Sequence, residues 1–320
     1  MVKPKISILI PVYRVEKYIE RCARSLFEQT LYGIEYIFID DCTPDRSIEI
    51  LRCMVEEYSS KLTDEEKSVK IVRMPTNSGL PAVRRYGLQL AEGEYIAHCD
   101  SDDWVDVTMY QKLYERAIED DSDIVVTGYK ETDSSSILMR NIHCFSSKKE
   151  YISNMLYAKE SWAVWDKLCK RELYNGIEFS KYNMGEDMVL TFQLVLKANK
   201  ISNVEECLYN YFFNSESITK TNSAERRYSN WKQSVYNTKK IISFLSDSQE
   251  ACLFHNEMLH LKYVQKRLAG NLAYHKMYSR EWIETFSSVN IIVYKLKSIS
   301  FIEKVKFYLL MGAAWIRTIL

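Results

Sequence analysis

The fold of this 320-residue chain is decided by one stretch, residues 94–104, which reads EYIAHCDSDDW. Its apolar segment, Tyr95–Cys99, ends abruptly in three carboxylates. Successive side chains of a β-strand point to opposite faces, so Asp100 and Asp102 project to the same side. Divalent cations such as Mg²⁺ prefer carboxylate and phosphate oxygens. The stretch therefore indicates a strand whose end holds a cation and a diphosphate.

The same acids have a second interpretation as helix caps. Asp and Ser are favoured at the N-cap, and Val107–Ile118 has the spacing of a helix. The cluster alone does not separate the two interpretations, so the choice between them depends on the segments that precede it.

Composition argues against two classes of protein. The 43 Lys and Arg residues equal the 43 Asp and Glu residues, so the chain has no basic field for nucleic acid. The longest apolar candidate, Phe307–Ile316, is about half of the roughly 20 residues that span a bilayer.

The eight cysteines are scattered without a Cys-x-x-Cys pair, which is typical of reduced thiols. We therefore expect a cytoplasmic protein.

Alternating strands and helices are expected in the first 130 residues. Apolar, β-branched runs recur at Ile6–Ile10, Tyr36–Ile39, Val69–Val72, Tyr95–Cys99 and Ile124–Thr127. Each of the first four is followed by helical spacing, which predicts an α/β fold with a mostly parallel sheet flanked by helices.

Polar residues follow three of these runs, at Pro11-Val12-Tyr13, at Asp40-Asp41 and at Asp100-Ser101-Asp102. Ligands bind at the carboxyl ends of the strands in such sheets, so the three clusters should converge on one crevice.

The second half of the chain is less regular. After residue 147 the strand and helix alternation does not resume in the pattern, and residues 151–215 are interpreted as the second half of the same domain. Beyond Ser223 the chain reads as helical. We therefore predict a first domain over residues 1–220 and a helical C-terminal region over residues 221–320.

Several motifs, taken in order, resemble family 2 glycosyltransferases of the GT-A fold, in particular bacterial members that build surface polysaccharides. The motifs are ILIPVY at 8–13, Asp41, NSGL at 77–80 with Arg84, GEYI at 93–96 leading into DSDDW at 100–104, WDKLCKREL at 165–173 and GEDM at 185–188. The resemblance covers roughly the first two thirds of the chain.

The resemblance implies an inverting transfer of a hexosyl or N-acetylhexosaminyl group from a nucleotide-diphosphate sugar, most often a UDP-sugar, to a saccharide or lipid-linked saccharide. It implies that the donor is bound by Pro11, Val12, Tyr13, Asp41, Asn77, Arg84, Asp100 and Ser101. It also implies that Asp102 and Asp100 hold Mn²⁺ or Mg²⁺ and that Asp187 is the catalytic base. The residues that it places on the acceptor side are Asp103, Trp165, Lys167 and Glu186.

Each of these roles has a structural alternative. Asp41 is also suited to an Asx turn with Thr43, and Asp187 to the first turn of a helix, where the dipole favours an acid. Trp165 is equally suited to core packing, and Lys167 to a solvated run of charges. Cys42 stands where the family pattern has glycine, in a loop for which only glycine takes positive φ freely.

Two further questions stay open in the sequence. Residues 291–320 combine apolar residues with Lys295, Lys297, Lys304, Lys306 and Arg317 against one acid, Glu303. This pattern fits a basic amphipathic helix at the inner face of the membrane, and equally a helix that closes the domain or forms a homodimer contact. The second question is whether the chain is a catalytically silent sugar-nucleotide-binding subunit of a polysaccharide-assembly complex, to which a base such as Asp187 would be of no use.

Overall fold

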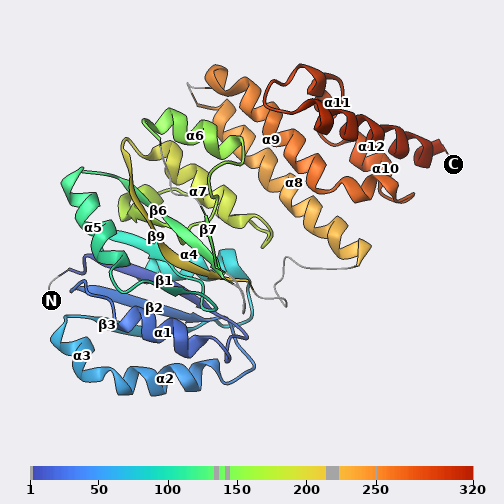
Figure 1. Ribbon diagram of the computed structural model, residues 1–320. Coiled ribbons are helices and arrows are strands. Elements are labelled where there is room, and N and C mark those ends of the chain that lie inside the picture. The colour runs from blue at the N-terminus through green and yellow to red at the C-terminus, as the bar shows by residue number, and fades with distance from the viewer. Residues whose placement is uncertain (1–2, 133–136, 141–144, 214–222, 249–250, 320) are drawn as a thin grey trace. The chain divides into compact units, whose positions relative to one another are not determined.

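The computed structural model describes residues 3–132, 137–140, 145–213, 223–248 and 251–319 (Figure 1). The chain divides into two compact units, which we describe separately. The first contains residues 1–148 and 161–217, and the second contains residues 149–160 and 218–320. The predicted domain boundary at residue 220 lies outside the described residues.

The first unit is built on a sheet that has nine strands within the described residues. Their order is β3-β2-β1-β4-β8-β6-β9-β5, with β7 paired to β6. The strands are β1 (Ile6–Val12), β2 (Ile34–Asp40), β3 (Ser68–Arg73), β4 (Tyr95–His98), β5 (Trp104–Val105), β6 (Ile124–Thr132), β7 (Ile137–Arg140), β8 (Lys167–Lys170) and β9 (Ile201–Phe212).

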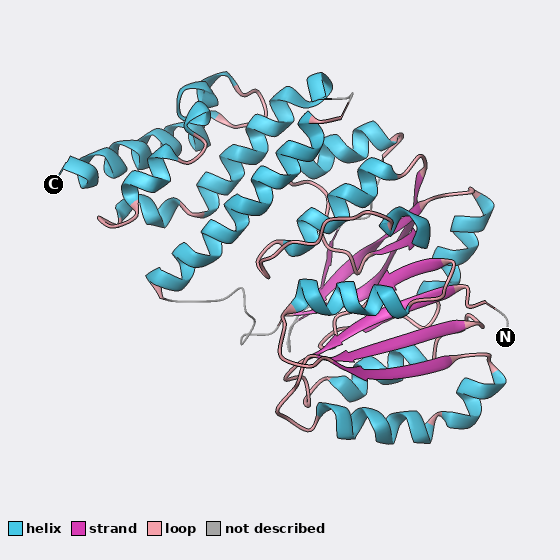
Figure 2. Ribbon diagram, turned by 180° about the vertical axis from the view of Figure 1, so that it is seen from behind, coloured by secondary structure: helices cyan, strands magenta, loops and turns pink. Residues whose placement is uncertain are grey.

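Helices cover this sheet, as Figure 2 shows from the opposite side. They are α1 (Ile19–Phe27), α2 (Ser47–Glu57), α3 (Ser59–Asp64), α4 (Leu80–Leu90), α5 (Met109–Glu119) and α7 (Glu186–Lys197). The stripe on α1 illustrates why they pack there, because Ile19, Cys22, Ala23 and Leu26 recur at helical spacing and all four are buried.

The parallel half of the sheet agrees with the strand pattern of the sequence. β1 pairs in parallel with both β2 and β4, and β2 pairs in parallel with β3. The expectation that the alternation stops after residue 147 is wrong, since β8, α7 and β9 follow. β8 is inserted antiparallel between β4 and β6, and β9 runs parallel to β6. β8 is short and β9 carries several polar residues, so neither has a strong apolar signal.

The second unit is helical. It comprises nearly all of α6 (Lys148–Leu156), then α8 (Ala224–Ser246), α9 (His255–Leu268), α10 (Ser279–Glu284), α11 (Ser287–Ile292) and α12 (Phe301–Ile319), with short 3₁₀ turns between them. Its core includes Trp231, Trp282 and Phe307, and the Trp282 indole donates a 3.0 Å hydrogen bond to the Lys266 carbonyl. Among the described residues, no helix is both long and apolar enough to cross a membrane.

Gly93 lies in the loop that precedes β4 and lets this loop pack closely against β1. Its amide donates a 2.8 Å hydrogen bond to the Ser7 hydroxyl, and a Cβ at residue 93 would lie 2.4 Å from the Ser7 backbone nitrogen. No side-chain rotation relieves a clash with backbone, so only glycine fits at this position.

Gly93→Ala should therefore lower the free energy of unfolding by about 1–3 kcal/mol, in the range of overpacked core substitutions. Gly87→Ala on α4 is the matched control. Its Cβ would lie 2.9 Å from Ile39 Cδ1, the movable end of a side chain, and we expect a change within about 1 kcal/mol. Urea unfolding followed by circular dichroism measures both. Equal stabilities of the two variants would contradict the role assigned to Gly93.

Candidate active site

The carboxyl ends of β1, β2 and β4 and the residues that follow them meet at one edge of the sheet. The Ser101 hydroxyl donates a 2.6 Å hydrogen bond to the Pro11 carbonyl, and the Asp41 amide donates a 3.0 Å hydrogen bond to the Val12 carbonyl. Because parallel strands end at the same edge, loops that are far apart in sequence come together here. Tyr13 lies beside them with 40% of its surface exposed.

Asp41 connects the end of β2 to the start of α4. Its two carboxylate oxygens accept hydrogen bonds from the Ser78 amide at 2.7 Å and the Gly79 amide at 3.0 Å. The Asn77 side chain donates to the Asp41 carbonyl at 3.1 Å. The alternative of an Asx turn between Asp41 and Thr43 is wrong, because the Thr43 amide donates to Asp40 instead.

Cys42 has a φ of 57°, in the left-handed region that favours glycine. Cys42 thus adopts a backbone conformation that glycine takes freely. The Cys42 thiol donates to the Met74 carbonyl at 3.1 Å, a contact that a glycine would lack.

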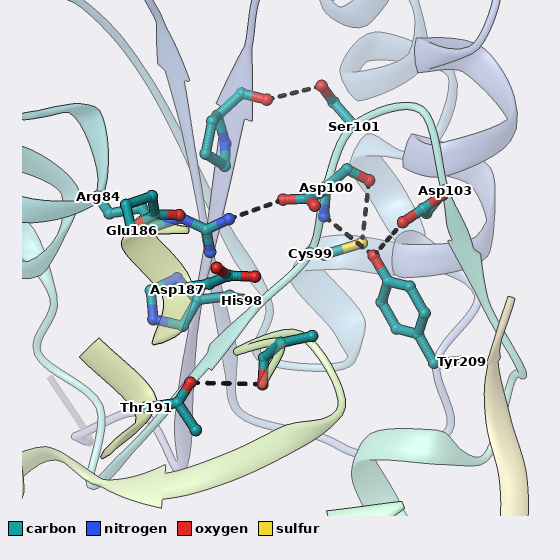
Figure 3. A network of polar contacts seen from close by, with 12 residues as sticks. Arg84, His98, Cys99, Asp100, Ser101, Asp103, Glu186, Asp187, Thr191 and Tyr209 are labelled. Carbon is teal, nitrogen blue, oxygen red and sulfur yellow. Dashed lines mark hydrogen bonds and ion pairs between the residues drawn. The ribbon is translucent and has the colours of Figure 1, made fainter. Parts of the chain in front are cut away.

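Arg84 of α4 is buried and joins two elements by ion pairs (Figure 3). Its Nη2 lies 3.1 Å from Asp100 Oδ1, and its Nε lies 3.0 Å from Glu186 Oε1. Figure 3 shows Asp187 beside the same guanidinium. One buried cation therefore holds the end of β4 against the first turn of α7. Within the described residues Nη1 of Arg84 has no hydrogen-bond partner.

The acids at this edge outnumber the cations, and burial raises several of their pKa values. Burial and the neighbouring Asp100 raise the pKa of Asp102 to about 6. Burial raises the pKa of Glu186 to about 7 against the opposing charge of Arg84, and burial also raises the pKa of Asp187. A cluster of this kind attracts cations.

The loop over residues 100–103 is held from β9 and α1. The Tyr209 hydroxyl accepts a 3.1 Å hydrogen bond from the Asp100 amide and donates a 2.7 Å hydrogen bond to Asp103. Arg21 of α1 donates to the Asp102 carbonyl at 2.8 Å, and its guanidinium lies 3.8 Å from the centre of the Trp104 ring. These contacts determine where the two strand-end carboxylates point.

The helix-cap interpretation of residues 100–103 is wrong. α5 begins only at Met109, after Thr108 at its N-cap, and the amide of Tyr110 in its first turn donates a 3.2 Å hydrogen bond to Gln29 rather than to an acid of residues 100–103. The alternative for Asp187, an acid in the first turn of a helix, agrees with the structure, because Asp187 lies in the first turn of α7 and its Oδ1 accepts a 2.9 Å hydrogen bond from the Met188 amide.

The four residues predicted on the acceptor side occupy enclosed positions. Asp103 is buried and accepts hydrogen bonds from Tyr209 and from the Phe212 amide at 2.7 Å. The Trp165 ring is stacked on Tyr209 at 4.2 Å, in the core. Lys167 is buried and paired with Asp166 at 2.6 Å, so it is not part of a solvated run of charges. Glu186, the fourth, is the buried partner of Arg84. Contact with an acceptor stays a prediction for all four.

The residues present fit a divalent cation that also binds phosphate. In the part of the chain that the structure describes, the Asp102 carboxylate accepts no hydrogen bond from another side chain, and the like charge of Asp100 lies close enough to raise its pKa. The described residues contain no group of three or more His, Cys, Asp or Glu side chains placed to share a metal. Asp100 and Asp102 would therefore supply only part of a coordination shell, as is usual where Mg²⁺ is shared with substrate phosphates.

Sequence reasoning missed two polar residues of this site. Tyr209 could not be found locally, since its partners Asp100 and Asp103 lie more than 100 residues away. His98 did carry a signal, because it precedes Asp100 by two residues on β4 and so shares its face. It is buried against Tyr174, and burial together with the charge of Arg84 keeps its pKa well below the usual value.

Comparison with known proteins identifies relatives of this chain. A family model described as glycosyl transferase family 2 matches residues 7–179. The chain is 32% identical over 226 residues to the uncharacterized glycosyltransferase EpsJ of Bacillus subtilis, an alignment that covers 68% of this chain and 63% of EpsJ. It is 27% identical over 212 residues to the poly(ribitol-phosphate) beta-N-acetylglucosaminyltransferase TarS of Staphylococcus aureus, over 65% of this chain and 35% of TarS. The chain thus spans less than two thirds of the length of either relative.

Solved structures resemble this one over most of its length. A crystal structure of TarS matches with a TM-score of 0.68 at 22% identity and covers 98% of this chain and 53% of TarS. TarS 1–349 in complex with UDP-GlcNAc matches with a TM-score of 0.60 at 20% identity, over 91% of this chain and 92% of that one. The mannosyltransferase PcManGT of Pyrobaculum calidifontis, in complex with GDP-Man and Mn²⁺, matches at 0.56 and 15% identity, over 98% and 81%. This likeness confirms the predicted GT-A fold.

Glu186 makes the stability of the protein depend on pH, and the direction of this dependence follows from its raised pKa. Its pKa is about 7 in the folded state and 4.5 as an ordinary value, so between these pH values the folded state binds more protons than the unfolded state. Stability from this group is therefore present at low pH and lost as the pH rises toward 7.

Glu186→Gln removes this titration. The difference in melting temperature, wild type minus variant, should be more positive at pH 5 than at pH 7.5 in metal-free buffer, as measured by thermal unfolding. A difference that stays constant across this range would show that Glu186 titrates at its ordinary pKa.

Proposed function

Since the chain belongs to glycosyl transferase family 2, we propose that it transfers a sugar from a UDP-sugar to a saccharide or lipid-linked saccharide in the synthesis of a cell-surface polysaccharide, with inversion at the anomeric carbon. The observation that carries this proposal is the set of acids at the edge of the sheet, in which Asp100, Glu186 and Asp187 lie around the buried Arg84 and Asp102 lies beside Asp100.

The donor pocket in this proposal is formed by the loops after β1, β2 and β3. Pro11, Val12 and Tyr13 line one side, and Asp41 and Asn77 the other, with Asp41 accepting a hydrogen bond from the uracil ring. Both Asp41 oxygens already accept one amide hydrogen, and each carboxylate oxygen has a second lone pair for the base. The choice of uridine is supported by TarS, whose structure of the same fold binds UDP-GlcNAc.

Arg84 and the strand-end acids would hold the diphosphate end of the donor. The unpartnered Nη1 of Arg84 is a buried donor suited to a phosphate oxygen, although Asp100 and Glu186 limit how far the guanidinium moves. Asp102 and Asp100 would hold Mn²⁺ or Mg²⁺, which neutralises the charge that develops on the departing diphosphate. The complex of PcManGT with GDP-Man and Mn²⁺ supports a metal in a protein of this fold.

Asp187 would act as the general base. As the acceptor hydroxyl oxygen forms its bond to the anomeric carbon, the bond from that carbon to the diphosphate oxygen breaks and the hydroxyl proton passes to Asp187. Attack by the acceptor itself is a single displacement, so the anomeric configuration inverts and no glycosyl-enzyme forms. Burial raises the pKa of Asp187 toward neutrality, which makes it a stronger base than an exposed aspartate.

Asp187→Asn should lower kcat by about 10²- to 10⁴-fold, the usual contribution of a general base, while UDP-sugar binding is kept. UDP release from a panel of UDP-sugars with Mn²⁺ and a saccharide acceptor measures turnover, and calorimetry measures binding. Asp64→Asn, at an exposed position at the end of α3, is the control and should match the wild type. Full turnover by Asp187→Asn would remove the base from this account, and donor binding without turnover by the wild type would favour the silent subunit.

Tyr209→Phe tests whether β9 positions the carboxylates. The variant keeps the ring stacked on Trp165 but loses the hydroxyl that bridges Asp100 and Asp103, which leaves a buried acid short of a donor. We expect affinity for UDP at saturating Mn²⁺ to fall about tenfold, which corresponds to about 1.4 kcal/mol. Tyr211→Phe, whose ring also stacks on Trp165, is the control. Wild-type affinity in a folded Tyr209→Phe protein would contradict the positioning role.

A further inference from the structure

Helix α12 of the second unit has apolar side chains on two faces. One face is packed inward, where Phe307, Met311 and Ala314 are buried and the Phe307 ring lies 6.0 Å from Trp282 and 5.4 Å from Tyr263. A helix that only closed this unit would need no second apolar face.

The second face is an exposed stripe. Its residues are 39–80% exposed and are Phe301, Ile302, Val305, Tyr308, Leu309, Trp315, Ile316 and Ile319. They recur at intervals of one, three or four residues, with Gly312 in line between them, so they form one continuous strip along the helix. No acid lies in the strip, and the Gly312 position has nothing within 4 Å of an added Cβ. An exposed apolar strip of this length indicates an interaction site.

Cations border this strip on both sides. At about 100° per residue, Lys304 lies next to Tyr308 and Trp315 along one edge, while Lys306 and Arg317 lie along the other edge. The one acid of the helix, Glu303, lies away from the strip and is paired with Arg267 at 2.9 Å and with Lys306 at 3.1 Å. The strip is thus apolar in the middle and positive at its edges.

We propose that α12 docks this protein on an anionic lipid bilayer, lying in the plane of the interface with the exposed strip buried at the boundary between headgroups and acyl chains. The arrangement has the parts such a helix needs: an apolar face, flanking cations for anionic headgroups, and Tyr308 and Trp315 at an edge where an aromatic ring has one side apolar and one side wet. The proposal is independent of the proposed function.

Charge favours the bilayer over a second copy of the chain as the occupant. In a symmetric dimer the same patch faces itself, so the cations along the strip would face cations. Glu303, the one acid on α12, already has two cationic partners. An anionic membrane surface complements the strip along its whole length.

Flotation of the full chain with vesicles tests this proposal. We expect binding to vesicles of phosphatidylglycerol and phosphatidylcholine, weakened by salt, and little binding to phosphatidylcholine alone. Leu309→Gln with Ile316→Gln should reduce the partition coefficient at least about tenfold by removing two large apolar side chains. Lys304→Gln with Arg317→Gln should reduce it at least about tenfold for the anionic vesicles only, because the anionic surface attracts each of the two cations.

The control replaces two equally exposed apolar residues outside the strip, Ile118→Gln with Met277→Gln, and should bind as the wild type does. Melting curves verify that each variant folds. The proposal would be overturned by a wild type that stays unbound with both vesicle types, or by a strip variant that binds as well as the control. A lipid-free dimer in analytical ultracentrifugation that the strip substitutions convert to monomer would assign the face to a second copy instead.

Discussion

The ion pairs of the buried Arg84 with the half-buried Asp100 and the buried Glu186 are the contacts on which the candidate site depends. Removing one partner of a buried pair leaves an uncompensated charge, so the pairs constrain three elements at once. They hold α4, the end of β4 and the first turn of α7 in one arrangement. Asp187 follows Glu186 directly, so the position of the proposed base is set by the same guanidinium that would face the donor diphosphate.

Arg84 does not by itself balance the acids at its edge of the sheet. Asp100, Asp102, Glu186 and Asp187 share one edge of the sheet, and burial raises the pKa of the last three. The same excess of acids is consistent with the proposed metal site and with the proposed role of Asp187 as base, whose pKa burial raises. Contacts from Tyr209 and Arg21 hold the backbone of the 100–103 loop from β9 and from α1.

Whether the sequence predicts a feature of the fold or the site depends on how far apart in the chain the interacting residues lie. The parallel strands and the strand-end acids are visible because each depends on its own neighbours, as in Tyr95–Cys99 followed by Asp100. The antiparallel insertion of β8 and the pairing of β9 depend on contacts between distant segments, and short or polar strands carry no local periodicity that reveals them. For that reason Trp165 and Lys167 were open between acceptor and structural roles in the sequence, whereas their burial is plain in the fold. The apolar strip on α12 is an intermediate case, since its spacing is in the sequence but its exposure is not.

The most direct test of the account is a crystal structure of the protein with UDP and Mn²⁺, with the metal located by its anomalous signal. We expect the metal within about 2.5 Å of an Asp102 carboxylate oxygen and of diphosphate oxygens, with Asp187 facing the open side of the donor pocket. A metal bound elsewhere, or UDP bound with Asp100 and Asp102 turned away from its phosphates, would contradict the central claim.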